Sequence, residues 1–355
     1  MFAEKNYPEI MLPEELDLYL SKGWYRMGQT IFTTHFLCFD DQFFSAIWIR
    51  LNVEKYRFRR SLRKLIRQNN RRFRTEVRKA TLTIEKEYLY KRYKATFPGI
   101  LAPSLKDSLL DGEDFNVFNT NEVAVSDGDK LVALGCFDIG KERTASIMGI
   151  YDPDYSKYSL GFYTMLQEIQ FCLISKKKFY YPGYVVPGYN RFDYKLRIGE
   201  VNYFDIKRQE WLPIEYLGKE DIPITKMENK LRDMENNLRQ MNIPAKVFNY
   251  PLFEANLFGF WKAPYFDFPI FLLCHPGKDA NSHLVIVFDV RSEMYQLIRC
   301  APFDDLQFYF NESYTNSFDR NRYFVELIIV ERILATSSDI EDIKNTLNTI
   351  SRVTS

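Results

Sequence analysis

Residues 151–195 read YDPDYSKYSLGFYTMLQEIQFCLISKKKFYYPGYVVPGYNRFDYK, and this stretch decides the fold class. The segment from Ser159 to Lys176 predicts a helix, and Phe179–Val186 predicts a strand after it. Three further strands are predicted before the helix, over Glu122–Ser126, Leu131–Ile139 and Thr144–Tyr151. A strand-strand-strand-helix-strand order indicates an α/β fold whose sheet is part antiparallel and part parallel.

The composition of the chain limits its class. Its 355 residues suggest two or three domains at roughly 100–200 residues each, and a hydrophobic content of 46% favours a packed core. Five scattered cysteines, an odd number, argue against a disulfide framework and for a reducing compartment. The first ten residues, MFAEKNYPEI, show no secretory signal pattern, and no run of about 20 apolar residues follows. We therefore expect a cytoplasmic protein without a membrane span.

Basic residues are concentrated in one segment of a chain whose net charge is only +1. Residues 54–79 hold twelve Lys and Arg against two Glu. Leu62, Leu65 and Ile66 have the spacing of an apolar helix face, and the cations fall mainly on the other side. These cations are Arg59, Arg60, Arg63, Lys64 and Arg67, with Arg71 and Arg72 beyond them. Such a helix can track a polynucleotide backbone, although a charge run is also typical of a solvated surface.

The C-terminal part has its own pattern after a boundary near Pro213–Asp221. Met227, Leu231, Met234, Leu238 and Met241 repeat at a 4-3-4-3 spacing, which predicts an amphipathic helix and a short coiled-coil seam. Further elements are predicted as strands near Pro269–Cys274, His283–Val290 and Glu293–Arg299, and as helices over Tyr323–Ala335 and Asp339–Ile350.

Several short motifs of the sequence resemble those of the arginyl- and leucyl-tRNA–protein transferases. In family order they are Tyr151-Asp-Pro-Asp154, Ser159-Leu-Gly161, Gly183-Tyr184, Pro187-Gly188 and Tyr194-Lys195. The basic RRSLRKLIRQN at 59–69, the YKRY at 90–93 and Gly23-Trp24 followed by Arg26 fit as well. The resemblance covers residues 12–215.

The resemblance implies a fold, a domain layout and an activity. It predicts a GNAT-like acyltransferase domain, a mixed sheet with flanking helices, over residues 83–218. An N-terminal domain with the basic helix would span residues 1–82, and an additional α+β domain of unknown role residues 219–355. The implied activity moves arginine or leucine from aminoacyl-tRNA to the N-terminal α-amino group of an acceptor beginning with Asp or Glu, which marks that protein for degradation. Aminoacyl-tRNA is then a co-substrate, and no cofactor is expected.

The same resemblance suggests roles for individual residues. Tyr194 can protonate the leaving ribose hydroxyl or orient the ester. Lys195 can neutralise a phosphate of the tRNA 3′ end, and Tyr184 can stack on the terminal adenosine. Asp152 and Asp154 can hold or deprotonate the incoming amine, although Asp before Pro and at a helix start is also common turn chemistry.

The start of the predicted 159–176 helix is the expected acyl-donor site. Backbone N–H groups near Ser159 and Gly161 can face a phosphate or an oxyanion, and Gly161 can instead serve close helix–strand packing. Lys157 is the single cation of this loop. Enzymes of this fold that use acetyl-coenzyme A carry a glycine-rich loop here, whereas residues 154–161 hold one glycine. This argues against coenzyme A and fits a bulkier donor.

The chain departs from the family pattern at two places. The cysteine cluster of the family's N-terminal half is reduced to His35 and Cys38, too few ligands for a structural zinc site, so no metal is expected. The family's Cys-Pro-Lys-Met becomes Tyr189-Asn-Arg-Phe192, in which Arg191 keeps the charge. Two other hypotheses stay open: a coenzyme A-dependent N-acyltransferase on the same fold, and a non-catalytic tRNA-binding adaptor. The sequence does not determine the oligomeric state.

Overall fold

The structure is a computed structural model that describes residues 1–39, 41–258, 263–274, 282–303 and 312–354. Its centre is an eight-stranded mixed sheet with strand order β13-β12-β6-β11-β10-β9-β8-β7. The strands are β6 (Ile47–Asn52), β7 (Arg74–Lys79), β8 (Thr120–Asp127), β9 (Lys130–Ile139), β10 (Arg143–Tyr151), β11 (Phe179–Val185), β12 (Asn202–Asp205) and β13 (Glu210–Pro213). In this sheet β10 and β11 pair in parallel, and the other neighbouring strands pair antiparallel. The mixed α/β sheet predicted from the sequence is therefore confirmed.

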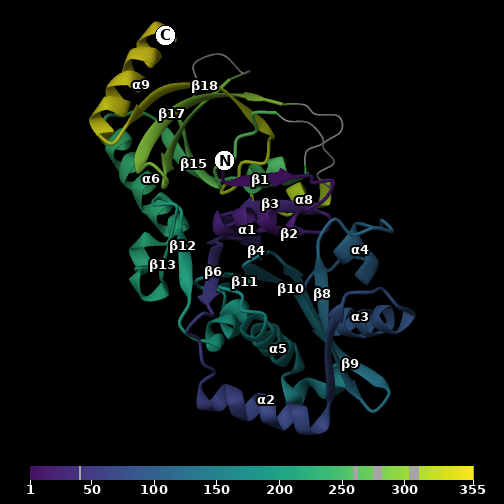
Figure 1. The fold of residues 1–355 in the computed structure, drawn as a ribbon. Coiled ribbons are helices and arrows are strands. Elements are labelled where there is room, and N and C mark those ends of the chain that lie inside the picture. The colour runs from purple at the N-terminus through teal and green to yellow at the C-terminus, as the bar shows by residue number, and fades with distance from the viewer. Residues whose placement is uncertain (40, 259–262, 275–281, 304–311, 355) are drawn as a thin grey trace.

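Helices cover both faces of this sheet. On one face, α5 (Leu160–Ile174) packs on β8, β9 and β10, and α2 (Arg60–Arg72) packs on α5. On the other face, α3 (Ile84–Thr96) and α4 (Leu105–Leu110) bury Leu89 and Leu105 against the sheet. Leu62 is buried on the inner side of α2, with Leu65 and Ile66 packed beside it, as the spacing predicted. Figure 1 shows α2 at the lower end of the molecule and the C-terminal sheet at the upper end.

The N-terminal residues form two small β elements between these ends. A three-stranded sheet holds β1 (Ala3–Asn6), β2 (Tyr25–Met27) and β3 (Thr30–Thr34), next to α1 (Pro13–Ser21). A hairpin follows, made of β4 (Phe36–Phe39) and β5 (Gln42–Ser45). Phe2 and Phe36 are buried in the same apolar cluster as the C-terminal strands. The eight-stranded sheet also takes β6 and β7 from before residue 83, so the proposed boundary at 82 does not coincide with a sheet edge.

The C-terminal part is a five-stranded antiparallel sheet with helices packed on it. Its strands are β14 (Ala245–Asn249), β15 (Ile270–Cys274), β16 (His283–Asp289), β17 (Met294–Pro302) and β18 (Ile328–Ser337). The helices of this part are α6 (Pro223–Gln240), α7 (Ala255–Phe258), α8 (Glu312–Asn316) and α9 (Ile340–Thr354).

Two predictions for this part are wrong. The segment Tyr323–Ala335 is not a helix, because Ile328–Ser337 pairs with β17 as an edge strand rich in β-branched residues. The predicted coiled-coil seam is also not a free surface. Met227, Leu231, Met234 and Leu238 of α6 are fully buried against the sheet of their own chain, while Met241 follows the helix end and is 39% exposed.

Candidate active site

A large cavity opens where β10 and β11 separate. The two strands pair in parallel over three residues, Arg143–Ala145 with Phe179–Tyr181. Beyond this point β10 has a bulge between Ser146 and Met148, and the register of β11 on β6 shifts between Tyr180 and Gly183. The resulting cavity has a volume of about 1050 Å³, and Ser146 and Gly149 line it on one side and Gly183 and Tyr184 on the other. A parallel pair that diverges next to a helix start provides a pocket for an elongated substrate.

Six of the residues predicted from the sequence line this cavity. They are Ser159, Gly161, Tyr184, Arg191, Tyr194 and Lys195. The structure therefore brings together the ends of three family-like motifs that are separate in sequence. The predicted residues Asp152, Asp154 and Lys157 are not among the lining residues, and neither are the cations of α2.

Lys195 is buried in the cavity wall at the 3₁₀ segment Asn190–Ile198. Its Nζ donates a hydrogen bond to the Tyr184 carbonyl at 2.9 Å and lies 5.1 and 5.0 Å from the ring centroids of Tyr184 and Phe192. No ion pair joins Lys195 to a carboxylate of the described residues. Burial without a counter-ion lowers the pKa of Lys195 to about 7. A buried cation without a carboxylate partner is a ready site for an anionic group of a substrate.

The glycine that faces Lys195 makes room for it. Gly183 has a φ of +95°, and a Cβ at this position would lie 3.1 Å from the Lys195 Nζ. A residue other than glycine would be strained there and would also crowd the ammonium group.

Tyr194 follows the same wall but is more accessible, with 41% of its surface exposed. Its ring packs edge-on against Phe162, with the centroids 6.4 Å apart. Loss of hydration, followed by the effect of neighbouring Tyr93, raises the pKa of the Tyr194 hydroxyl to about 12. The hydroxyl thus stays protonated at neutral pH and can donate a proton or a hydrogen bond.

Arg191 offers a donor without a partner. Its Nη1 donates to the Pro98 carbonyl at 2.9 Å, and its guanidinium stacks 4.1 Å from the Phe97 ring centroid. The Nη2 atom is buried and has no hydrogen-bond partner among the described residues. Since a buried unpaired donor is costly, a substrate oxygen that accepts from Nη2 would be bound favourably.

The residues that replace the family's Cys-Pro-Lys-Met form an aromatic wall. Tyr189 and Phe192 both stack on Phe39 of β4, with centroid distances of 5.1 and 6.2 Å. Tyr184 extends this wall by packing on Phe192 at 5.2 Å and on Trp48 at 5.0 Å. This departure from the family pattern therefore builds an apolar, stacking surface in the cavity.

Asp152 and Asp154 belong to an ion-pair network and do not line the cavity. Arg92 Nη2 of α3 is 2.7 Å from Asp152 Oδ1 and 2.8 Å from Asp154 Oδ2, and Lys130 Nζ is 2.7 Å from Asp152 Oδ2. Burial raises the pKa of Asp152, but the hydrogen bonds from Lys130, the Asp154 N–H and Arg92 outweigh it, and the net pKa is lowered. These contacts favour the turn-chemistry alternative for both residues.

The start of α5 combines a close helix–strand contact at Gly161 with a left-handed turn at Ser159. A Cβ on Gly161 would lie 3.2 Å from the Tyr151 ring, so glycine permits the close helix–strand packing that was the alternative for this residue. Ser159 has a left-handed backbone, with φ 54°, and precedes the first turn of the helix. Lys157 lies in the preceding turn, 5.2 Å from the Tyr158 ring centroid.

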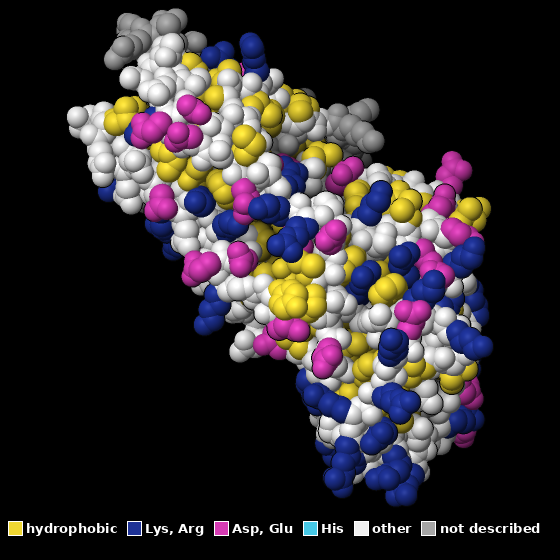
Figure 2. Space-filling view, turned by 60° about the vertical axis from the view of Figure 1, so that its left-hand side comes forward, with side chains coloured by type: hydrophobic (Ala, Val, Ile, Leu, Met, Phe, Trp, Pro, Cys, Tyr) yellow, Lys and Arg dark blue, Asp and Glu magenta, His cyan; other side chains and the backbone are white. Residues whose placement is uncertain are grey.

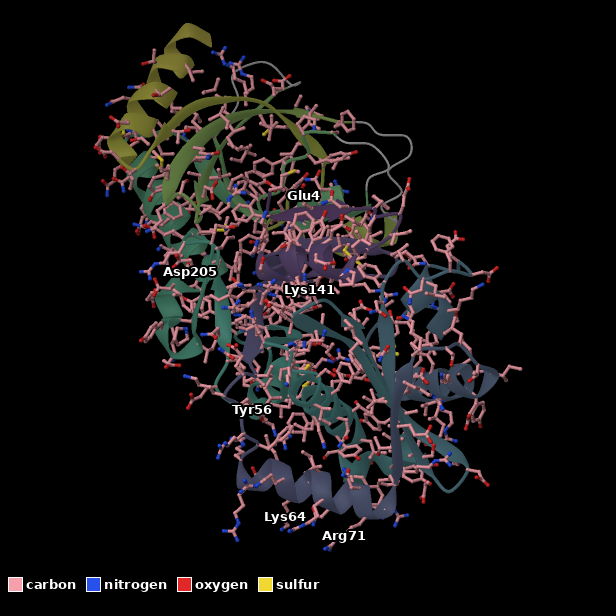
Figure 3. The ribbon with its side chains drawn as sticks, viewed as in Figure 1. Glu4, Tyr56, Lys64, Arg71, Lys141 and Asp205 are labelled. Atoms are coloured by element: carbon pink, nitrogen blue, oxygen red, sulfur yellow. The ribbon has the colours of Figure 1, made fainter. Side chains whose placement is uncertain are left out.

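The cations of α2 form an exposed basic face. All five predicted members, Arg59, Arg60, Arg63, Lys64 and Arg67, are exposed, and α2 contains no acidic residue. In Figure 3, Lys64 and Arg71 point away from the body of the protein. Figure 2 shows Lys and Arg gathered at the lower end of the molecule, where Figure 1 has α2. Arg59 also donates to the Arg197 carbonyl at 2.8 Å, and Arg197 lines the cavity, so the basic face reaches the cavity.

Sequence reasoning missed a carboxylate that lines the cavity. Glu168 of α5 lines it, is 1% exposed and accepts a hydrogen bond from the Tyr180 hydroxyl at 2.7 Å. Burial raises the pKa of this carboxyl to about 8, against the lowering effect of hydrogen bonds from Tyr180 and Ser146. The signal in the sequence was a single carboxylate inside an otherwise uncharged helix. Carboxyls with such a raised pKa cluster at functional sites.

No metal-binding group emerges from the described residues, where no three His, Cys, Asp or Glu side chains lie together as metal ligands. His35 is partly buried, and loss of hydration lowers the pKa of its imidazole to about 3, while Cys38 lines the cavity. Within the described ranges, none of the helices has the length and apolar content needed to cross a membrane.

Comparisons with known proteins place the chain in a family. The sequence profile of the family described as "Arginine-tRNA-protein transferase, C terminus" matches residues 71–205. An aspartate/glutamate leucyltransferase of Leptospira interrogans is 26% identical over 194 residues, covering 53% of this chain and 74% of the relative. One of Campylobacter jejuni is 30% identical over 207 residues, covering 54% and 80%. The chain thus belongs to the aminoacyl-tRNA–protein transferase family, and the resemblance noted in the sequence is confirmed.

Solved structures give weaker similarity. The crystal structure of FemX aligns with a TM-score of 0.32 and 10% identity, covering 54% of this chain and 65% of that one. The C-terminal domain of a putative lysylphosphatidylglycerol synthetase from Agrobacterium fabrum gives 0.32 and 12%, covering 40% and 46%. At these TM-scores neither similarity supports a statement about function.

Proposed function

We propose that this chain transfers arginine or leucine from aminoacyl-tRNA to the N-terminal α-amino group of an acceptor protein that begins with Asp or Glu. The added residue marks the acceptor for degradation. One observation carries the proposal: Tyr194 and Lys195, which form the last of the family-like motifs, line the cavity between β10 and β11. Family membership and the names of the curated relatives support both the reaction and the acceptor class.

The reaction exchanges an ester for an amide. The acceptor nitrogen attacks the ester carbonyl, the C–N bond forms, and the bond to the ribose oxygen breaks. Because this exchange is downhill, the step needs positioning, donors for the oxyanion and proton transfer, with no cofactor besides the aminoacyl-tRNA. Tyr194 is the proposed acid for the leaving ribose oxygen, consistent with a hydroxyl that stays protonated at neutral pH.

The incoming amine must lose a proton, and two sets of carboxyls are candidates. Asp152 and Asp154 were proposed from the sequence, but Arg92 and Lys130 already pair with them outside the cavity. Glu168 lines the cavity and has no ion-pair partner among the described residues. We therefore assign proton acceptance to the ionised form of Glu168, whose population grows as pH rises toward its pKa of about 8, and give Asp152 and Asp154 the supporting role of fixing the turn before α5.

The donor tRNA is proposed to lie along α2. Its backbone would contact Arg59, Arg60, Arg63, Lys64 and Arg67, and its 3′ end would pass Arg197 into the cavity. There Lys195 and Arg191 would meet anionic or carbonyl oxygens, and Tyr184 would stack on the terminal adenosine as part of the aromatic wall. Backbone N–H groups near Ser159 and Gly161 remain candidates for the oxyanion, with Lys157 nearby as a tRNA contact.

The division of the chain into domains is part of the same proposal. We place a GNAT-like catalytic domain at residues 83–218, an N-terminal domain with the basic helix at 1–82, which lends β6 and β7 to the catalytic sheet, and an α+β domain at 219–355. The diverging parallel pair next to α5 supports the GNAT-like assignment. A cytoplasmic location fits a substrate that is a charged tRNA.

A panel of charged tRNAs tests the proposal. Purified protein is incubated with tRNA carrying labelled Arg or Leu and with peptides that begin with Asp, Glu, Arg or Lys. We expect label on peptides beginning with Asp or Glu from one of the two donors. Absence of label in every pairing, while a family enzyme works alongside, would sink the proposal.

A further inference from the structure

A second hollow lies between the C-terminal sheet and the β4–β5 hairpin, apart from the catalytic cavity. It consists of two cavities of about 630 and 290 Å³. Both are lined by Glu228, Asn249, Ile270 and Arg322, so they form one continuous groove between α6 and β14. We call it the α6–β14 groove. Most of its lining residues lie within residues 219–323, beyond the family-like residues 12–215.

The α6–β14 groove adjoins the catalytic cavity through two shared segments. In the β4–β5 hairpin, Cys38 and Phe39 line the cavity while Asp41–Phe44 line the groove. After β11, Pro187 and Gly188 line the groove while Tyr189 lines the cavity. The rings of Phe44 and Tyr189 lie 5.7 Å apart between the two hollows. A chain whose end enters the cavity can therefore continue past Tyr189 into the groove.

The walls of the groove are held in place by contacts between the hairpin and the C-terminal part. The backbone N–H of Ile224 in α6 donates to Ser45 Oγ at 2.9 Å. The Tyr323 hydroxyl donates to the Asp41 carbonyl, and the Tyr323 and Phe43 rings stack at 6.3 Å. The groove is thus formed before any ligand binds, which lowers the entropy cost of binding.

Charge decides which substrate the groove fits. Residues 219–355 carry fifteen Lys and Arg against nineteen Asp and Glu, whereas residues 1–218 carry thirty-three against twenty-eight. The lining of the groove itself holds four acidic and four basic side chains, so it lacks the excess of cations that a tRNA backbone requires. The groove offers both charges and apolar side chains, as with Glu228, Arg322 and Ile270, which suits a polypeptide.

We propose that the α6–β14 groove binds the polypeptide of the acceptor downstream of its first residue. The C-terminal domain then selects acceptors by the segment that follows the N-terminal Asp or Glu. This inference rests on the proposed function and adds a second contact with the same substrate.

The test compares acceptors of two lengths that share a first residue. A dipeptide reaches only the catalytic cavity, whereas a peptide of about twelve residues also reaches the groove at roughly 3.3 Å per residue. The groove variant combines Glu228→Lys with Arg322→Glu, and the matched control is Asp233→Lys, an exposed acid of α6 outside the groove. KM for both acceptors and for aminoacyl-tRNA is measured in all three proteins. Thermal unfolding checks that the variants are folded.

We expect the groove variant to raise KM for the long peptide about tenfold or more, with unchanged KM for the dipeptide and for aminoacyl-tRNA, and the control to behave as wild type. Equal KM ratios of long to short acceptor in all three proteins would overturn the inference while leaving the function intact. Failure of wild-type protein to label even the dipeptide would instead overturn the proposed function and, with it, this inference.

Discussion

The family-matched part and the C-terminal part of this chain were open to sequence reasoning in different degrees. In the first, short motifs within residues 151–195 contribute lining residues to one cavity, and Tyr194 and Lys195 are among them. In the second, only periodicity was available. This periodicity predicted which face of α6 is buried but not the surface that covers it, which is the sheet of the same chain. Chemical motifs thus predict a place in the fold, whereas apolar patterns predict only that a face is covered.

Substitution of Tyr194 has the largest expected effect on the matched part. Tyr194→Phe removes the proposed acid but keeps the ring against Phe162, so kcat should fall by about 10²–10⁴-fold with little change in KM for aminoacyl-tRNA. Steady-state transfer measurements check this split. Tyr216→Phe, an exposed tyrosine outside the cavity, is the matched control. A Tyr194→Phe enzyme with wild-type kcat would remove the acid role.

The C-terminal part should respond in stability first. Leu231→Ala empties a fully buried position of α6, at a cost of about 2–5 kcal/mol in the free energy of unfolding. Urea unfolding measures this cost. Leu18→Ala in α1, where the side chain is 55% exposed, serves as the control and should cost much less. A small effect at Leu231 would contradict the packing of α6 on its own sheet.

The basic face of α2 should govern tRNA affinity. The triple change Arg60→Gln, Arg63→Gln and Arg67→Gln removes three exposed cations, so KM for aminoacyl-tRNA should rise about tenfold or more and depend less on salt. Transfer rates at several salt concentrations check this, and the same number of Lys→Gln changes on the C-terminal part should leave both quantities unchanged. An unaltered salt slope would exclude α2 as the tRNA contact.

Two groups in the cavity predict smaller effects that depend on pH. The pKa of Lys195 is about 7, so this group loses its charge as pH rises through that value. Binding of aminoacyl-tRNA should then weaken by up to about tenfold per pH unit above it. In Lys195→Arg the cation persists, and KM measured from about pH 6 to 8 should be flat. A wild-type profile as flat as that of Lys195→Arg would contradict an anion contact at Lys195.

The pKa of Glu168 is raised from 4.5 to about 8, so the folded protein holds a proton that the unfolded chain releases between these values. The free energy of unfolding should therefore fall as pH rises through this window, by up to about 1.4 kcal/mol per unit. Glu168→Gln removes this loss, which urea unfolding at several pH values measures. An unchanged pH slope in Glu168→Gln would show that the carboxyl is not buried in its neutral form.

Particular residues show where sequence reasoning ends. The spacing of Leu62, Leu65 and Ile66 was enough to orient α2, because a helix face follows from periodicity alone. The role of Phe39 was not accessible, since its contacts with Tyr189 and Phe192 join segments about 150 residues apart. In the sequence Glu168 does not differ from an ordinary helix carboxylate, because the cavity beside it exists only in the fold, where β10 and β11 separate. The helix predicted over Tyr323–Ala335 is wrong for a related reason. Ile328–Ser337 is a strand because it pairs with β17, and local propensity does not report that pairing.

The central claim is that the cavity joins an amino acid from tRNA to the N-terminus of a protein. The most direct measurement is the intact mass of an acceptor beginning with Asp or Glu after incubation with charged tRNA, alongside the same acceptor with an acetylated N-terminus. The account predicts a gain of one arginine or leucine residue, located at the N-terminus by fragmentation, and no gain on the acetylated acceptor. An unchanged mass with every donor, or equal gain on the acetylated acceptor, would contradict it.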